Sequence, residues 1–127
     1  MSDYLLDTNI LILHLRGRSD ITALLAKWAA TSTLFISVVT RTEILAGMRP
    51  HETTRTMALL NSLTSIAVDE AIADEAGRLI YQYARRNIRL SFPDTLIAVT
   101  ALQHNLTLVT TNVKHFPMPT LRLLAVK

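Results

Sequence analysis

The sequence predicts a three-layer α/β domain, with a parallel sheet between two layers of helices. Short β-favouring runs alternate along the chain with segments of helical apolar periodicity. Such alternation builds β-α-β units, whose strands pair in parallel and are covered by helices on both faces. Half of the residues are apolar and only three are glycine, which is typical of a densely packed globule. The chain has no linker or internal repeat, so we expect residues 1–127 to form a single domain.

Five short apolar runs are the expected strands. They are residues 3–6, 34–38, 65–68, 106–109 and 121–126. The first is followed at once by TNILILHLRG, which predicts a helix that ends near Gly17. A second helix is expected behind Ser19 or Asp20 as N-cap, because apolar residues recur there at i, i+3, i+4, i+7 and i+8. These are Ile21, Leu24, Leu25, Trp28 and Ala29.

A third helix is expected with Asp69 and Glu70 in its first turn, and its apolar residues are Ile72, Ala76, Leu79, Ile80 and Tyr83. We interpret these acids, with Asp74 and Glu75, as complementing the helix dipole rather than as a binding site. Residues 94–104 are apolar on most faces, which predicts a helix that is buried on more than one side.

The composition excludes several classes of protein. Without cysteine there can be no disulfide framework, thiolate zinc site or cysteine nucleophile. No basic region opens the chain, and its apolar runs are far shorter than the ~18 residues of a membrane span. We therefore expect a cytoplasmic protein that does not enter a membrane.

The net charge of +3 is placed unevenly. Residues 95–127 carry three basic residues and no acid, and arginine outnumbers lysine ten to three over the chain. Arginine suits bidentate phosphate contacts, so the balance fits a polyanionic partner, although many ordinary proteins share it.

Three acids stand at the junctions of predicted elements. Asp7 directly follows the first strand, Glu43 lies at the start of the helix after the second, and Asp94 begins a helix just after Pro93. The carboxyl ends of parallel strands meet at one edge of a sheet, where ligands bind. Oxygen ligands of this kind select Mg²⁺ or Mn²⁺, ions that activate water and polarise phosphodiesters.

Each acid also has a structural explanation. Asp7 and Asp94 suit helix N-caps, and Thr40 with Glu43 has the spacing of a capping box. The apolar neighbours of all three acids favour the metal interpretation, because a carboxylate beside buried elements is costly unless a cation or partner compensates it. No other nucleophile–base arrangement, spaced histidine pair or glycine-rich phosphate loop is present.

Four motifs resemble those of the PIN-domain family, and of the VapC-type ribonuclease toxins of VapBC systems in particular. YLLDTNILI resembles the first motif, with its acid at Asp7 followed by Thr8 and Asn9. TEILAG places Glu43 at the second acid, and FPDTLIAVTAL places Asp94 at the third. LVTTNVKHF resembles the last motif, with Asn112 in the expected place. The resemblance covers essentially the whole chain, in the family's order.

This resemblance implies a PIN-like αβα fold with a central parallel sheet of about five strands. It further implies a toxin that cleaves RNA with Mg²⁺ or Mn²⁺, homodimerises and is inhibited by a VapB-like antitoxin. Asp7, Glu43 and Asp94 would hold the metal and carry catalysis, supported by Thr8, Asn9, Asn112 and His115.

His115 is a departure from the family pattern, which usually has a fourth acid there, and no acid follows Asp94. We therefore expect a three-carboxylate site that favours Mn²⁺ more than four-acid relatives do. The departure also keeps open a non-catalytic module that binds RNA or protein. An unrelated alternative is a phosphorylation-receiver domain, which would need an acidic pair where only Asp7 stands.

Three arginines are candidates for RNA binding. Arg41 lies two residues before Glu43, and Arg85 and Arg86 close a helix rich in charge. A solvated helix face explains Arg85 and Arg86 at least as well.

Overall fold

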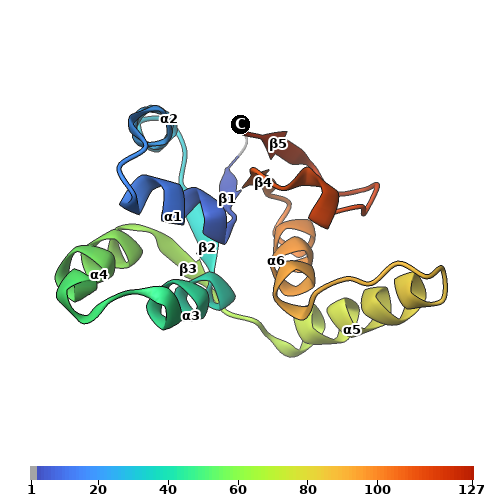
Figure 1. Ribbon diagram of the computed structural model, residues 1–127. Helices are drawn as coiled ribbons and strands as arrows, with labels where there is room; N and C mark the ends of the chain where they lie inside the picture. The colour runs from blue at the N-terminus through green and yellow to red at the C-terminus, as the bar shows by residue number, and fades with distance from the viewer. Residues whose placement is uncertain (1–2) are drawn as a thin grey trace.

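A five-stranded parallel sheet forms the middle layer of the protein, seen in a computed structural model that describes residues 3–127 (Figure 1). The strands are β1 (Tyr4–Leu6), β2 (Leu34–Ser37), β3 (Thr64–Ile66), β4 (Thr107–Thr110) and β5 (Leu123–Ala125). Their order in the sheet is β3-β2-β1-β4-β5, with every neighbouring pair parallel. The predicted α/β architecture and all five predicted strands are confirmed.

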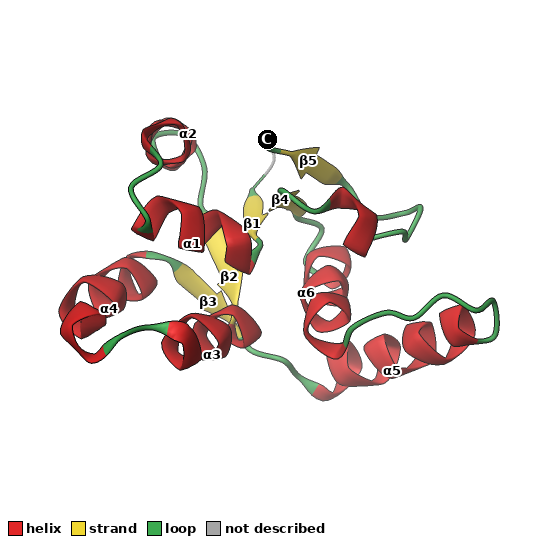
Figure 2. Ribbon diagram, in the orientation of Figure 1, coloured by secondary structure: helices red, strands yellow, loops and turns green. Residues whose placement is uncertain are grey.

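Helices cover both faces of the sheet (Figure 2). They are α1 (Thr8–Leu15), α2 (Ser19–Ala29), α3 (Val38–Gly47), α4 (Thr53–Ser62), α5 (Glu70–Ala84) and α6 (Phe92–Gln103), with short 3-10 turns η1 (Pro50–Glu52) and η2 (Val113–His115). Helices α1 to α4 lie on one side of the sheet, and α5 and α6 pack together on the other (Figure 1). Among residues 3–127 no helix is both long and apolar enough to cross a membrane.

Alternate residues of the central strands supply the two cores. Leu6 and Val109 pack with the helices of the α1–α4 side, whereas Leu5 and Leu108 pack with α5 and α6. All four side chains are fully buried, as expected of a strand that is covered on both faces. The polar residues at the ends of β1 and β4 are therefore held in a rigid frame.

Two helix starts differ from the prediction. Val38 opens α3 instead of ending β2, because the Ser37 hydroxyl accepts a hydrogen bond from the Val39 N–H at 3.1 Å and caps the helix. Helix α2 begins at Ser19, but Arg18 stands at its N-cap position with no side-chain cap hydrogen bond. The expected capping of α2 by Ser19 or Asp20 is therefore wrong.

The end of α1 agrees with the prediction, whereas α4 and the bounds of β3 do not. Gly17 ends the first helix as predicted, with φ +87°, a left-handed conformation that glycine adopts without strain. Helix α4 is not among the predicted helices, because TTRTMALLNS has only four apolar residues and they stand together at 57–60. The third strand spans Thr64–Ile66 rather than residues 65–68.

Candidate active site

Asp7 is a buried carboxylate at the carboxyl end of the central strand. Only 5% of the residue is exposed to solvent. Oδ1 accepts a hydrogen bond from the Thr8 N–H at 2.8 Å, so Asp7 caps α1 as well as facing the site. Oδ2 accepts from the Thr110 hydroxyl, also at 2.8 Å. Thr110 ends β4, the strand beside β1, so two adjacent strands determine where this carboxylate points.

Glu43 comes from the middle of α3, not from the start of the helix as predicted. Its Oε1 accepts a 2.6 Å hydrogen bond from the Thr8 hydroxyl, and Thr40 Oγ1 lies 3.1 Å from the same hydroxyl. The alternative explanation of Thr40 and Glu43 as a capping box is wrong, because Ser37 caps α3. Glu43 is also exposed, so the argument from buried apolar neighbours does not apply to it. Thr8 thus joins Asp7, through its N–H, to Glu43, through its hydroxyl.

Asp94 lies in the first turn of α6, which begins at Phe92 rather than at Asp94. The Ser91 hydroxyl accepts a hydrogen bond from the Asp94 N–H at 3.2 Å, so Ser91 is the N-cap and the capping explanation of Asp94 is wrong. The Asp94 side chain is 26% exposed, and its Oδ2 lies 3.3 Å from His115 Nδ1. The Asp94 carboxylate therefore does not cap the helix, and it faces His115.

The charges of Asp94 and Glu43 act on the carboxyl group of Asp7. Burial raises the pKa of the Asp7 carboxyl, the hydrogen bonds from Thr110 and Thr8 oppose that rise, and the charges of Asp94 and Glu43 add to it. The structure therefore brings Asp94 and Glu43 within electrostatic reach of Asp7. Across residues 3–127, however, no three His, Asp or Glu side chains form a preassembled metal-binding group.

The loop after β4 is tied to Asp7 through Thr110. The Asn112 N–H donates to the Thr110 hydroxyl at 2.9 Å, and that hydroxyl donates to Asp7 Oδ2. The side chains of Asn112 and Asn9 are half-buried. Sequence reasoning missed Thr110; its position at the carboxyl end of a strand next to that of Asp7 was the available signal.

The predicted RNA-binding arginines have protein partners. The Arg41 guanidinium donates to the Leu60 carbonyl, the Ser65 hydroxyl and the Asn61 side chain, at 3.2 to 3.3 Å. These contacts tie α3 to the end of α4 and explain Arg41 without RNA. Arg85 and Arg86 lie over the rings of Tyr81 and Tyr83, at 5.7 and 4.8 Å from the ring centroids.

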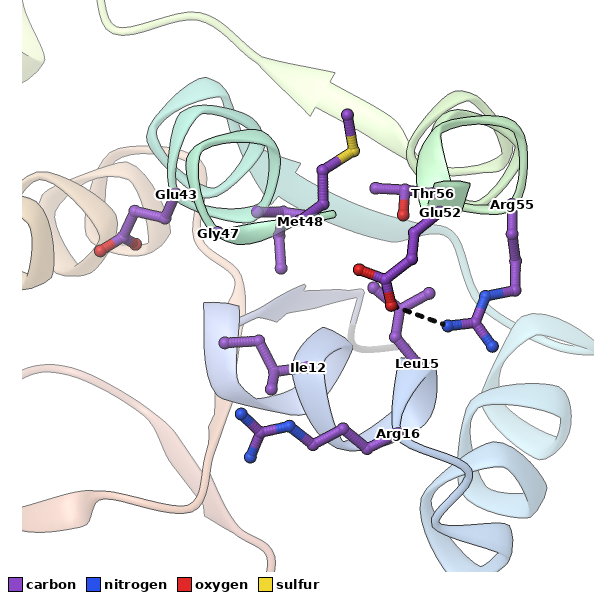
Figure 3. A pocket seen from close by; sticks show the side chains of 10 residues that line it. Ile12, Leu15, Arg16, Glu43, Gly47, Met48, Glu52, Arg55 and Thr56 are labelled. Atoms are coloured by element: carbon purple, nitrogen blue, oxygen red, sulfur yellow. Dashed lines mark ion pairs between the residues drawn. The ribbon is translucent and has the colours of Figure 1, made fainter. Parts of the chain in front are cut away.

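A groove of about 230 Å³ runs beside Glu43, between α1, α3 and the start of α4 (Figure 3). Its apolar lining includes Ile12, Leu15 and Met48. Glu52 and Arg55 also line the groove, and they form an ion pair of 3.8 Å. The groove therefore offers a surface of mixed apolar and charged character that leads to one of the three acids.

Several known proteins are similar to this chain in sequence. Ribonuclease VapC10 of Mycobacterium tuberculosis is 40% identical over 114 residues, covering 90% of this chain and 86% of the relative. Ribonuclease VapC19 of the same organism is 37% identical over 115 residues, covering 90% and 92%.

Two solved structures are also similar. A toxin–antitoxin complex from Klebsiella pneumoniae contains a chain that is 31% identical, with a TM-score of 0.82 and 97% of each chain covered. VapBC2 from Rickettsia felis, bound to a DNA fragment from its promoter, contains one that is 26% identical, with a TM-score of 0.85 and 96% and 97% covered. The model of the PIN domain matches residues 4–117, which include all three carboxylates and Asn112, and the chain therefore belongs to the PIN domain family.

Proposed function

We propose that this protein is a metal-dependent endoribonuclease and the toxin of a type II toxin–antitoxin module. The observation that carries the proposal is Asp7, a buried acid whose pKa is raised further by Asp94 and Glu43. Like charges placed together around a buried carboxylate are unfavourable unless a cation joins them. The names of the relatives VapC10 and VapC19 support ribonuclease activity in particular.

The residues present fit a divalent metal ion. All three acids offer hard oxygen ligands, the type that Mg²⁺ and Mn²⁺ prefer. Mg²⁺ usually binds through one or two carboxylates and keeps several waters, so a preassembled group of three protein ligands is not required. Bound there, the ion would lower the pKa of an attacking water and stabilise charge on a phosphodiester.

The protein's own part is to position and orient these acids. Asp7 is held by Thr8 and Thr110, both on the rigid ends of central elements. Thr8 orients Glu43, which is exposed and so accessible to RNA or to water. These hydrogen bonds keep the acids in place before substrate arrives, which lowers the reorganisation needed for reaction.

A cleavage assay tests the proposal. The purified protein should cleave single-stranded RNA with added Mg²⁺ or Mn²⁺, and excess chelator should abolish cleavage. Undiminished cleavage in chelator would contradict a metal mechanism. RNA binding without cleavage under any divalent ion would favour the second candidate, a non-catalytic module, for which the His115 contact on Asp94 is the supporting observation.

The partner we propose is a VapB-like antitoxin, because the Klebsiella and Rickettsia relatives were solved as toxin–antitoxin assemblies. The groove beside Glu43 suits a short antitoxin segment that carries both apolar and charged side chains, and an arginine on that segment would complement the acids. Reversing the charge of each arginine in the antitoxin's inhibitory segment should identify one that inhibition needs. Inhibition that survives every reversal would contradict the arginine contact.

We also propose a homodimer, formed through the outer face of α5 and α6. Two large side chains on this face are unusually exposed, Tyr81 at 63% and Phe92 at 69%. Both line a hollow of about 370 Å³ whose floor includes the small residues Ala73 and Gly77. A protruding ring beside a hollow of small residues is self-complementary about a two-fold axis, as an isologous contact requires.

A further inference from the structure

His115 stands against one oxygen of a proposed metal ligand. Its Nδ1 lies 3.3 Å from Asp94 Oδ2, and its side chain is 56% exposed. Its backbone N–H donates to the Asn112 carbonyl, and the Asn112 N–H donates to Thr110, the residue that orients Asp7. The backbone of His115 is thus joined by a short chain of hydrogen bonds to the centre of the site.

The distance between the two atoms matches a pair of metal ligands. A hydrogen bond between an imidazolium and a carboxylate is typically about 2.7–2.9 Å long, shorter than the 3.3 Å observed here. Two ligand atoms bound at right angles to one ion, with bonds of about 2.0–2.2 Å, lie roughly 3 Å apart. An ion on Asp94 Oδ2 would therefore meet His115 Nδ1 after only a small side-chain adjustment.

We propose that His115 Nδ1 and Asp94 Oδ2 are paired ligands of the divalent ion, which makes this site selective for a transition metal such as Mn²⁺ over Mg²⁺. The inference rests on the metal-dependent function proposed above and deepens it. Imidazole nitrogen suits transition metals, whereas Mg²⁺ demands oxygen ligands in near-octahedral geometry.

No acid in the loop that carries His115 can restore an all-oxygen site there. Asp94 is the last acidic residue of the chain, and the neighbours of His115 in the loop are Lys114 and Phe116. Lys114 cannot offer a lone pair while it is protonated, and Phe116 is apolar and buried. His115 is accordingly the residue that sets the chemical character of this side of the site.

The experiment uses Mn²⁺ itself as the probe, on the whole protein. Pulsed electron paramagnetic resonance of the Mn²⁺-loaded protein should show coupling to a ¹⁴N nucleus. Calorimetric titrations should give a Kd for Mn²⁺ below that for Mg²⁺. In His115→Ala the nitrogen coupling should vanish and the Mn²⁺ Kd rise roughly tenfold or more.

Two further variants make the result specific. His115→Asp should lose the nitrogen coupling but bind Mg²⁺ more tightly than the wild type, because an oxygen ligand replaces nitrogen. His104→Gln is the matched control, since His104 is exposed at the far end of α6, and it should retain both the coupling and the Mn²⁺ Kd.

The outcomes separate this inference from the function on which it rests. Mn²⁺ binding without nitrogen coupling, or coupling that persists in His115→Asp, would overturn the inference and leave the metal-dependent nuclease intact. Mg²⁺ affinities that are identical in the wild type and His115→Asp would also overturn it. Failure of Mn²⁺ and Mg²⁺ to bind at all would overturn both.

Discussion

Asp7 is a buried acid whose ionisation opposes folding. Burial, the first cause of its raised pKa, makes the folded protein hold this proton more tightly than the unfolded chain does. The folded state then binds more protons, so stability falls as pH rises from the unfolded pKa, about 3.9, through the folded pKa. Above that window the penalty is complete.

We expect Asp7→Asn to melt at the same temperature as the wild type or higher at pH 7 without metal. The amide oxygen can still cap α1, and asparagine caps about as well as aspartate. Cleavage should fall roughly a hundredfold or more, the scale of loss when one preorganised electrostatic contact is removed. Thermal melts between pH 3 and pH 8 should show the stability difference disappearing at the acid end.

Asp20 is the matched control, because its pKa is shifted in the opposite direction. Arg18 donates hydrogen bonds to Asp20 and lowers the pKa of that exposed carboxyl to about 2. Its contribution to stability is present above the unfolded pKa and lost as pH falls through the folded pKa. Asp20→Asn should therefore melt slightly earlier at pH 7 and cleave RNA normally. If Asp7→Asn melts earlier and remains active, Asp7 is a structural cap only.

Glu43 allows a cleaner separation of site from scaffold, because it is exposed and does not cap α3. Glu43→Gln can keep the hydrogen bond from the Thr8 hydroxyl through its amide oxygen. We expect cleavage to be lost while urea unfolding changes by less than about 0.5 kcal/mol. Glu75→Gln, on the surface of α5 beside Arg78, should leave cleavage unaltered. A normal cleavage rate in Glu43→Gln would remove Glu43 from the proposed site.

At the scale of elements, the strands were predictable because apolar runs separate clearly from polar turns, whereas helix starts were not. SFPD offers two plausible caps, Ser91 and Asp94, and the capping pattern alone does not choose between them. Pro93 favours Ser91, because proline is common in the first turn of a helix. The three acids were found from chain order and motif. The motif also places His115 at the site. The contacts of His115 with Asp94 and of Thr110 with Asp7 could not be predicted, because they join segments whose approach depends on tertiary packing.

Helix α6 positions Asp94, so its cap should influence both stability and cleavage. Ser91→Ala removes the acceptor for the Asp94 N–H and should cost about 1 kcal/mol in urea unfolding. Cleavage should fall several-fold because the first turn that carries Asp94 frays. Ser91→Asn, which also caps well, should restore both properties. Equal unfolding free energies for wild type and Ser91→Ala would show that this cap does not stabilise α6.

At the scale of the whole molecule, the charges of α5 explain how two copies would pair. Along one stripe of the helix, spaced three or four residues apart, lie Glu70, Asp74, Gly77, Tyr81 and Arg85. A Cβ atom added at Gly77 would meet no heavy atom within 4 Å, so the centre of the stripe is open to close approach. Two such helices crossing antiparallel near Gly77 place the acidic end of one against Arg85 of the other.

A charge swap tests this pairing. Light scattering should give twice the chain mass for the wild type, and the chain mass for Arg85→Glu, in which acid meets acid across the two-fold axis. Glu70→Arg should dissociate in the same way, and the double variant should recover the dimer because opposite charges face each other again. Glu70→Arg also disfavours the first turn of α5, but the double variant carries the same cost, so recovery reports the contact between copies. Lys27→Glu, exposed on α2, is the control and should remain dimeric. A wild type that stays monomeric at every concentration would refute the dimer, and a double variant as dissociated as its parents would refute this interface.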